Sequence, residues 1–164
     1  MGDEAQAKIP DRAGTTMIRE LTDDDLADVI PLLIQLSPHA VDPDRETLRS
    51  KIVELRASEH VKVFGYESNI GIVGMCTVGR IEGLSHDCKP FAVIESVVVH
   101  ESVRREGIGT QLVRHAVDQA EKWQCYKVVL ETGTKNEGKL RFYEKCGMLR
   151  GEKTAFIRRF RPRQ

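Results

Sequence analysis

The sequence has no long apolar run, no closely paired cysteines and no excess of either charge. No segment is long and apolar enough to predict a membrane span, and no signal peptide is visible. Lys and Arg together number 25, as do Asp and Glu, whereas binding nucleic acid in bulk needs a basic surface. We therefore expect neither a membrane nor a nucleic acid among the partners of this chain.

The four cysteines are too far apart to form a CxxC or zinc-ligand pattern. Because free cysteine behaves as a small, usually buried side chain, we interpret them as reduced core thiols in a cytoplasmic compartment. They are Cys76, Cys88, Cys125 and Cys146. The histidines do not pair at metal-ligand spacing either, so we expect no bound metal.

Length and patterning predict one domain. The chain has 164 residues, of which 40% are hydrophobic, enough for one core. Residues 1–15 lack periodicity and are interpreted as a flexible N-terminal arm, which leaves residues 16–164 as a single domain.

The order of the expected elements predicts an α/β fold. Strands are expected at residues 17–20, 61–66, 70–78, 91–99, 126–130 and 154–160. Helices are expected after Thr22, with a kink or a split at Pro31, after Asp42-Pro43, and at residues 107–123 and 139–146. Early strands joined by a hairpin are expected to be antiparallel, and strands 91–99 and 126–130, joined through a helix, parallel.

The segment from Val97 to Thr110 is the most informative part of the chain. A β-branched run ends at a polar turn, and a helix is expected to begin within Arg104, Arg105, Glu106, Gly107, Ile108, Gly109 and Thr110. A helix start offers unpaired N–H groups and the positive end of the peptide dipoles, and glycines let the backbone close around an anion. This pattern predicts a diphosphate-binding turn, with a turn that binds no ligand as the alternative. A dinucleotide fingerprint would need glycine at Leu112, and a P-loop would need Gly-Lys-Ser/Thr.

The same residues resemble a known family. Arg104-Arg105-Glu106-Gly107-Ile108-Gly109 fits the (Gln/Arg)-x-x-Gly-x-(Gly/Ala) signature of the GCN5-related N-acetyltransferases, and Asn136 and Tyr143 resemble that family's later asparagine–tyrosine element. The resemblance covers roughly Ile18 to Phe160. It implies the GNAT fold, with a mixed central sheet of about six to seven strands flanked by about four helices. It also implies an acyltransferase that uses acetyl-CoA as co-substrate.

A narrower likeness is to the glucosamine-6-phosphate N-acetyltransferases. The stretches Cys125-Tyr126-Lys127-Val128 and Phe142 to Gly147 look like those enzymes. They carry an acidic Glu-Asp pair where this chain has Glu95-Ser96, so this substrate is only a minority interpretation.

The resemblance implies where acetyl-CoA binds. Its pantetheine arm would pair with strand backbone at Val97, Val98 and Val99, and amides near Val98 would polarise the thioester. Its diphosphate would lie on the turn from Arg104 to Thr110. Asn136 would bond the pantetheine arm, or alternatively serve only as a turn former.

Two side chains are candidates for proton transfer. Glu95 lies on an otherwise apolar strand, where burial would raise its pKa from about 4.3 and suit a general base; the alternative is a salt-bridged strand carboxylate. Tyr143 is the candidate acid for the leaving thiolate, or alternatively a packed aromatic.

These observations favour an acetyl-CoA-dependent N-acetyltransferase that acts on a primary amine of a small molecule by direct transfer in a ternary complex. The alternatives are a protein or peptide N-acetyltransferase and a non-catalytic acyl-CoA-binding sensor. We expect acceptor specificity in Ser37–Asp42 and Gly79–Pro90, which contain His39 and His86. Dimers are frequent in the family, which leaves a homodimer open.

Overall fold

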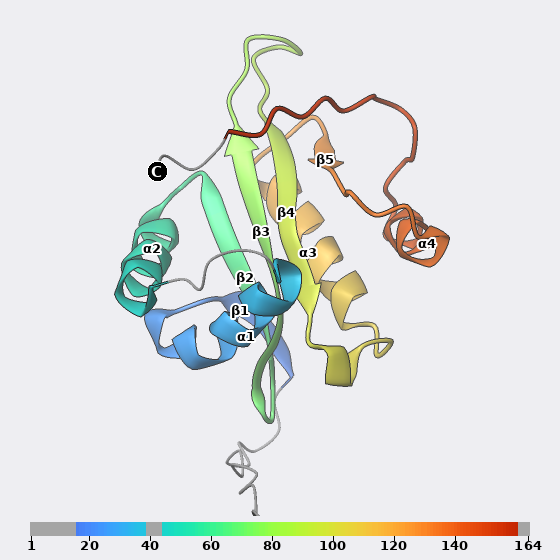
Figure 1. Ribbon diagram of the computed structural model, residues 1–164. Helices are drawn as coiled ribbons and strands as arrows, with labels where there is room; N and C mark the ends of the chain where they lie inside the picture. The colour runs from blue at the N-terminus through green and yellow to red at the C-terminus, as the bar shows by residue number, and fades with distance from the viewer. Residues whose placement is uncertain (1–15, 39–43, 161–164) are drawn as a thin grey trace, which may run out of the picture.

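Five strands form one mixed sheet in the order β1-β2-β3-β4-β5. Figure 1 shows the computed structural model, which describes residues 16–38 and 44–160. The strands are β1 (Met17–Glu20), β2 (Val61–Ser68), β3 (Gly71–Ile81), β4 (Phe91–Val99) and β5 (Val128–Leu130). The helices are α1 (Leu26–Leu36), α2 (Arg45–Ala57), α3 (Ile108–Lys122) and α4 (Glu137–Lys145), with short 3-10 turns η1 (Asp23–Asp25) and η2 (Glu101–Val103).

Two expected strand directions are confirmed. The hairpin strands β2 and β3 pair antiparallel, while β4 and β5, joined through α3, pair parallel. β1 and β2 are also antiparallel although α1 and α2 lie between them in the chain, and β3 pairs antiparallel with β4.

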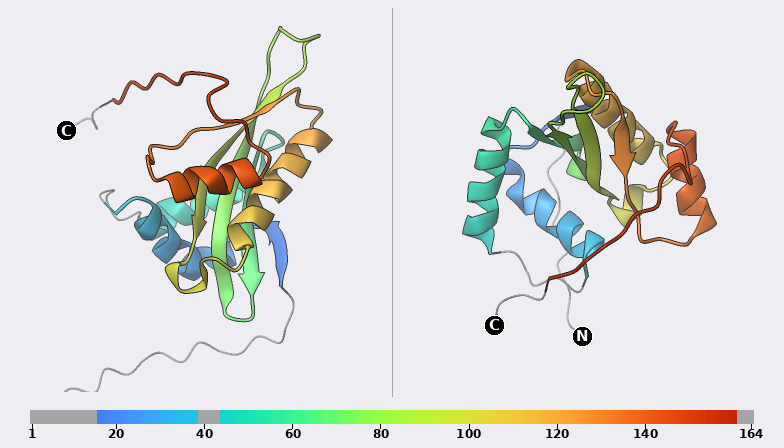
Figure 2. Two further views of the ribbon diagram at one scale, coloured as in Figure 1. Left: turned by 90° about the vertical axis from the view of Figure 1, so that its right-hand side faces the viewer. Right: turned by 90° about the horizontal axis from the view of Figure 1, so that it is seen from above.

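Helices cover both faces of the sheet. The larger core lies under α3 and contains Ile94 and Leu112, and a second core under α1 contains Leu32 and Met75. Figure 2 shows α1 and α2 on one side of the strands and α3 on the other, with α4 beside β5. The sheet therefore lies between two helical layers, and α4 lies beside its β5 edge.

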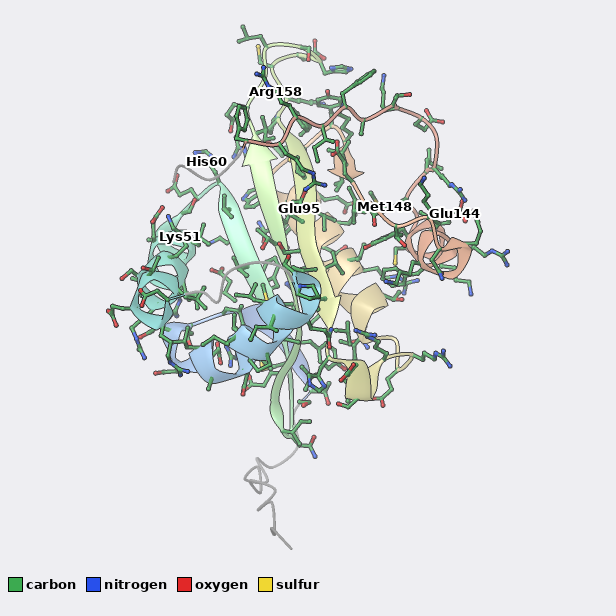
Figure 3. The ribbon with its side chains drawn as sticks, in the orientation of Figure 1. Lys51, His60, Glu95, Glu144, Met148 and Arg158 are labelled. Atoms are coloured by element: carbon green, nitrogen blue, oxygen red, sulfur yellow. The ribbon has the colours of Figure 1, made fainter. Side chains whose placement is uncertain are left out.

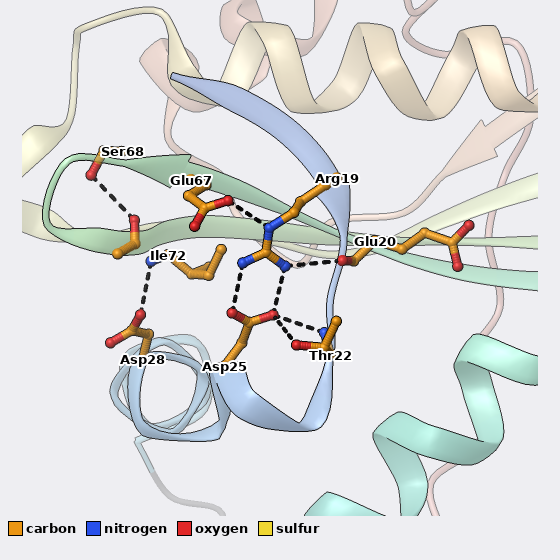
Figure 4. A network of polar contacts seen from close by, with 9 residues as sticks. Arg19, Glu20, Thr22, Asp25, Asp28, Glu67, Ser68 and Ile72 are labelled. Atoms are coloured by element: carbon orange, nitrogen blue, oxygen red, sulfur yellow. Dashed lines mark hydrogen bonds and ion pairs between the residues drawn. The ribbon is translucent and has the colours of Figure 1, made fainter. Parts of the chain in front are cut away.

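A polar network fastens β1 to η1 and β2. The guanidinium of Arg19 donates to both carboxylate oxygens of Asp25, each at 2.8 Å, and to Glu67 at 2.6 Å (Figure 4). The backbone N–H of Thr22 donates to Asp25, which completes a capping box. In α1, Asp28 accepts a hydrogen bond from the N–H of Ile72 at 2.9 Å and so ties the helix to β3.

The strand count predicted from the resemblance is too high. Residues 154–160, expected to form the last strand, belong to no strand among the described residues, and all of their side chains are exposed. Phe156 and Phe160 are 92% and 84% exposed. An apolar, β-branched stretch becomes a strand only where another strand accepts its hydrogen bonds, and the described sheet ends at β5.

Three smaller expectations also need correction or fall outside the structure. Of the two outcomes expected at Pro31, a split is wrong, because α1 runs unbroken from Leu26 to Leu36. Of the cysteines only Cys76 is buried, and Cys88 is exposed, so the four are not uniformly core residues. Asp42-Pro43, His39, the N-terminal arm and the last four residues lie outside the described residues.

Candidate active site

The parallel strands β4 and β5 are paired over only part of β4. Their register joins Ala92, Val93 and Ile94 to β5, whereas β4 continues to Val99. The second half of β4 therefore has no strand neighbour on its β5 side among the described residues. A strand edge of this kind can accept an extended ligand through its backbone groups.

A β-bulge at Ser96 determines which backbone groups of β4 face this opening. Thr77 pairs with Glu95 and Met75 with Val98, so one residue of β3 opposes two of β4. Ser96 adopts φ +55°, a left-handed conformation that is uncommon for a residue other than glycine. The extra residue reverses which groups of β4 point toward β3.

Beyond the bulge, the odd-numbered residues turn their backbone groups to the opening. The N–H of His100 donates to Val73 of β3 at 2.8 Å, and backbone groups alternate sides along a strand. The N–H and C=O of Val97 and Val99 therefore point away from β3, whereas those of Val98 point toward it. Of the three valines expected to line the site, Val97 and Val99 therefore turn their backbone groups to the opening.

The expected diphosphate turn follows β4 directly. Residues 104–107 are exposed, and α3 begins after Gly107, whose carbonyl accepts the N–H of Gln111 at 3.1 Å. Gly107 has φ +82°, and an added Cβ would meet no atom within 4 Å. Gly107 is thus required by its backbone conformation, and the space beside it is open, as an anion site at a helix start requires.

Gly109 has a different reason to be glycine. A Cβ there would lie 3.1 Å from the ring of Phe142 in α4, so the missing side chain lets α4 pack on the first turn of α3. This contact holds α4, which carries Tyr143, against the start of α3. The packing role of Phe142 could not be predicted from the sequence, because the contact joins two helices that are far apart in the chain.

Tyr143 is half-buried on α4, and its electrostatic neighbours identify its surroundings. Burial raises the pKa of Tyr143 above its ordinary value, and the nearby Cys146 and Glu95 act in the same direction. The influence of Glu95 on this pKa shows that the two predicted proton-transfer residues lie within electrostatic reach of each other. The phenol therefore stays protonated at neutral pH.

Glu95 is not buried, which corrects the expectation from the sequence. Its side chain is exposed although its neighbours along β4 are apolar. Before the bulge Ile94 packs under α3, so Glu95 faces the α1 side, whereas the core under α1 is built on Met75 and Val98, beyond the bulge. Figure 3 labels Glu95 midway along β4, where no helix is drawn over it.

Asn136 caps a helix. Its side-chain oxygen accepts the N–H of Lys139 at 3.1 Å, as the N-cap of α4. The cap uses the side-chain oxygen and leaves the amide NH₂ as the group for any bond to a ligand.

The loop between β3 and β4 extends beyond the end of the sheet (Figure 1). His86, Asp87 and Cys88 all have positive φ. The ring of His86 is stacked on Tyr126 with centroids 3.9 Å apart, which holds the loop against the segment that leads into β5.

Two kinds of feature are absent from the described residues. Within residues 16–38 and 44–160 no helix has the length and apolarity to cross a membrane. The same residues contain no group of three or more His, Cys, Asp or Glu placed to hold a metal.

The sequence that forms this site lies within the match to a known family model. The model describes the acetyltransferase (GNAT) family and matches residues 18–148. This chain belongs to that family. As a member it is an N-acetyltransferase with acetyl-CoA as its co-substrate.

Similar proteins support this assignment. A glucosamine 6-phosphate N-acetyltransferase 1 from Oryza sativa is 30% identical over 132 residues, which are 76% of this chain and 78% of the relative. A glucosamine 6-phosphate N-acetyltransferase from Arabidopsis thaliana is 29% identical over 57% of this chain, and the match covers 66% of that protein, just under two thirds. The structure of a putative acetyltransferase from Agrobacterium tumefaciens superposes with a TM-score of 0.80 at 29% identity, covering 87% of this chain and 99% of that one.

Proposed function

We propose that this GNAT enzyme transfers the acetyl group of acetyl-CoA directly to the primary amine of a small molecule. The observation that carries the proposal is the opening beside the second half of β4. The backbone of Val97 and Val99 lines it, the glycine turn lies at one end, and Glu95 is close enough to Tyr143 for its charge to raise the pKa of the phenol. A single opening can thus bring the thioester, a proton acceptor and a proton donor together.

The backbone of Val97 and Val99 would orient the thioester. The N–H groups there face the opening, where they can hydrogen-bond the pantetheine arm or polarise the thioester carbonyl. Arg104, Arg105 and the first N–H groups of α3 would hold the diphosphate. These residues fit the co-substrate, because its peptide-like arm can pair with the strand edge while its anionic diphosphate lies at the helix start that follows.

Two side chains would then move protons. The amine nitrogen attacks the thioester carbon and forms the N–C bond, while Glu95, directly or through a water, accepts the proton that the amine loses. The C–S bond breaks, and Tyr143 donates its phenolic proton to the sulfur. An exposed Glu95 suits a base that is reached by an acceptor entering from solvent.

The acceptor would be a small amine. Two relatives are named for glucosamine 6-phosphate, but Ser96 stands where the resemblance expects an aspartate, and here it forms the bulge. We therefore propose the amine class rather than that sugar. All four cysteines are free thiols, which supports our placement of the enzyme in the reducing cytoplasm.

The test is an acetyl-transfer assay over amino sugars and their phosphates, polyamines, amino acids, aminophosphonates and peptides. Turnover on a small amine is expected. Turnover on peptides alone would replace the proposal with a protein N-acetyltransferase, and acetyl-CoA binding without any turnover would replace it with a sensor.

Tyr143→Phe tests the proton donor. Because only the phenolic hydroxyl is removed, we expect kcat to fall about a hundredfold, with the Kd for CoA unchanged. Cys146→Ser, which alters a neighbour of the phenol but not the proton donor, is the control. If Tyr143→Phe turns over like the wild-type enzyme in single-turnover kinetics, Tyr143 has no part in the reaction.

A further inference from the structure

One side chain from α1 bridges two backbone groups at the end of β4. The amide nitrogen of Gln35 donates to the carbonyl of Val99 at 2.9 Å, and the N–H of Glu101 donates to its amide oxygen at 3.0 Å. Gln35 lies 64 and 66 residues from these partners in the sequence. It is half-buried in the last turn of α1. No sequence motif marks it, because a pair of hydrogen bonds across the fold leaves no local pattern.

Gln35 and a second donor together engage the carbonyl oxygen of Val99. Val99 also accepts a hydrogen bond from Nε of Arg104 at 3.3 Å, so both lone pairs of its oxygen are engaged within the chain. Of the two groups that Val99 turns to the opening, only the N–H then remains for a ligand. Gln35 and Arg104 thereby meet on the same atom, and Arg104 is a residue proposed to contact the diphosphate.

The segment held by Gln35 leads directly into the diphosphate turn. Arg105 and Gly107 have φ +71° and +82°, and left-handed residues persist only where the surrounding structure holds them. The exit of this turn is fixed by α3, which begins at Ile108. Its entry is fixed by hydrogen bonds within η2 and by the side chain of Gln35.

We infer that Gln35 is a positioning residue for acetyl-CoA. By holding Val99 and Glu101 it sets the direction in which the following turn presents its amides and Arg104 to the diphosphate. It takes no part in proton transfer. The inference rests on the site proposed above for the co-substrate, and it adds a residue from α1 to a site otherwise built from β4, α3 and α4.

The experiment compares three variants by calorimetric titration with CoA and by steady-state kinetics. Gln35→Leu removes both hydrogen bonds at similar size. Gln35→Glu keeps an acceptor for the N–H of Glu101 but sets a carboxylate against the carbonyl of Val99. Gln119→Leu removes a half-buried glutamine from α3, far along the helix from the turn, and is the matched control.

We expect the Kd for CoA and the KM for acetyl-CoA to rise about tenfold in Gln35→Leu and further in Gln35→Glu, since a turn that is no longer held must be ordered when CoA binds. The kcat at saturation should stay within about twofold, and Gln119→Leu should leave the Kd and KM unchanged. The Tm of Gln35→Leu should fall by a few degrees because two hydrogen bonds between elements are lost. A role in folding alone would lower the Tm and leave the Kd of the folded protein unchanged.

Gly107→Trp, which fills the turn itself, distinguishes a failure of the inference about Gln35 from a failure of the proposed CoA site. If Gly107→Trp abolishes CoA binding while Gln35→Leu and Gln35→Glu bind like the wild-type enzyme, Gln35 does not position the turn and the proposed site stands. If all three bind normally, CoA lies elsewhere and both the site and the inference are wrong. A fall in kcat as large as the rise in KM would also overturn the positioning role.

Discussion

Two polar regions of this molecule differ in whether their hydrogen-bonding groups are paired within the chain or left available. Around Arg19 the charges are turned inward: Asp25 is only 6% exposed, and the guanidinium pairs with two carboxylates (Figure 4). In the turn before α3, Arg104 and Arg105 are exposed, and the helix start leaves N–H groups without partners inside the helix. The first region satisfies its polar groups within the chain, whereas the second keeps them available.

The first region is therefore expected to affect the stability of the fold, and the second the binding of a ligand. Buried charges are tolerated only when they are paired, so the first region stabilises the junction of β1, η1 and β2. Exposed donors at a helix start contribute little to folding, yet they are placed to hold an anion. Variants in the two regions should therefore affect different measurements.

The largest expected effect is on CoA binding in Gly107→Trp. The indole would occupy the open space beside Gly107, and we expect CoA binding to weaken more than a hundredfold by calorimetric titration. Gly151→Trp is the matched control, since Gly151 has φ +84° and the same open surroundings. Equal losses of affinity in the two variants would mean that backbone strain, rather than a filled site, is responsible.

The next effect is on folding in Arg19→Ala. Removing the guanidinium leaves Asp25 buried without its main partner, and we expect a loss of about 2 kcal/mol in the free energy of unfolding by urea. That is less than for a fully buried pair, because a quarter of the Arg19 side chain is exposed. CoA affinity should not change in the folded protein.

Arg49→Ala is the control for that measurement. Its 3.0 Å ion pair with Asp23 is exposed on both sides, so the expected loss is below about 0.5 kcal/mol. If the two arginine variants unfold alike, the buried network does not stabilise the protein more than a surface pair does.

The smallest expected effect is the contribution of Asp25 to the pH dependence of the free energy of unfolding. Burial alone would raise its pKa, but hydrogen bonds from Arg19 and Thr22 outweigh burial, so the pKa of Asp25 lies below its ordinary value. Its stabilising contribution is therefore complete above about pH 4, near the pKa of an unfolded aspartate, and is lost as pH falls through the native pKa. We expect the stability gap between the wild-type protein and Asp25→Asn to be constant from pH 7 to 5 and to narrow below pH 4. A gap that widens on acidification would contradict this sign.

Much of the chain could be predicted from the sequence. β-branched runs, Thr22 before three aspartates and Gly147 after α4 are local signals, and the elements they indicate are present. The Gly107 turn could be found for the same reason: a helix start and its glycine are neighbours in sequence. The residues assigned to the turn by sequence lie together at the end of β4 because they are consecutive.

Local pattern failed where a residue depends on partners far along the chain. Glu95 belongs to an apolar run, yet it is exposed because the bulge at Ser96 and the limited reach of α1 decide its surroundings. Residues 154–160 are expected from the sequence to form a strand but pair with no strand among the described residues.

The sequence by itself determined the order of strands and helices up to α4, the parallel crossover through α3 and the glycine turn that opens it. Only the tertiary structure decided that β4 and β5 part after Ile94, that Val97 and Val99 face the opening, and that Gln35 holds the strand end. The reason is physical: propensity and turn chemistry act over a few residues, whereas burial, register and hydrogen bonds between elements depend on what the folded chain brings alongside.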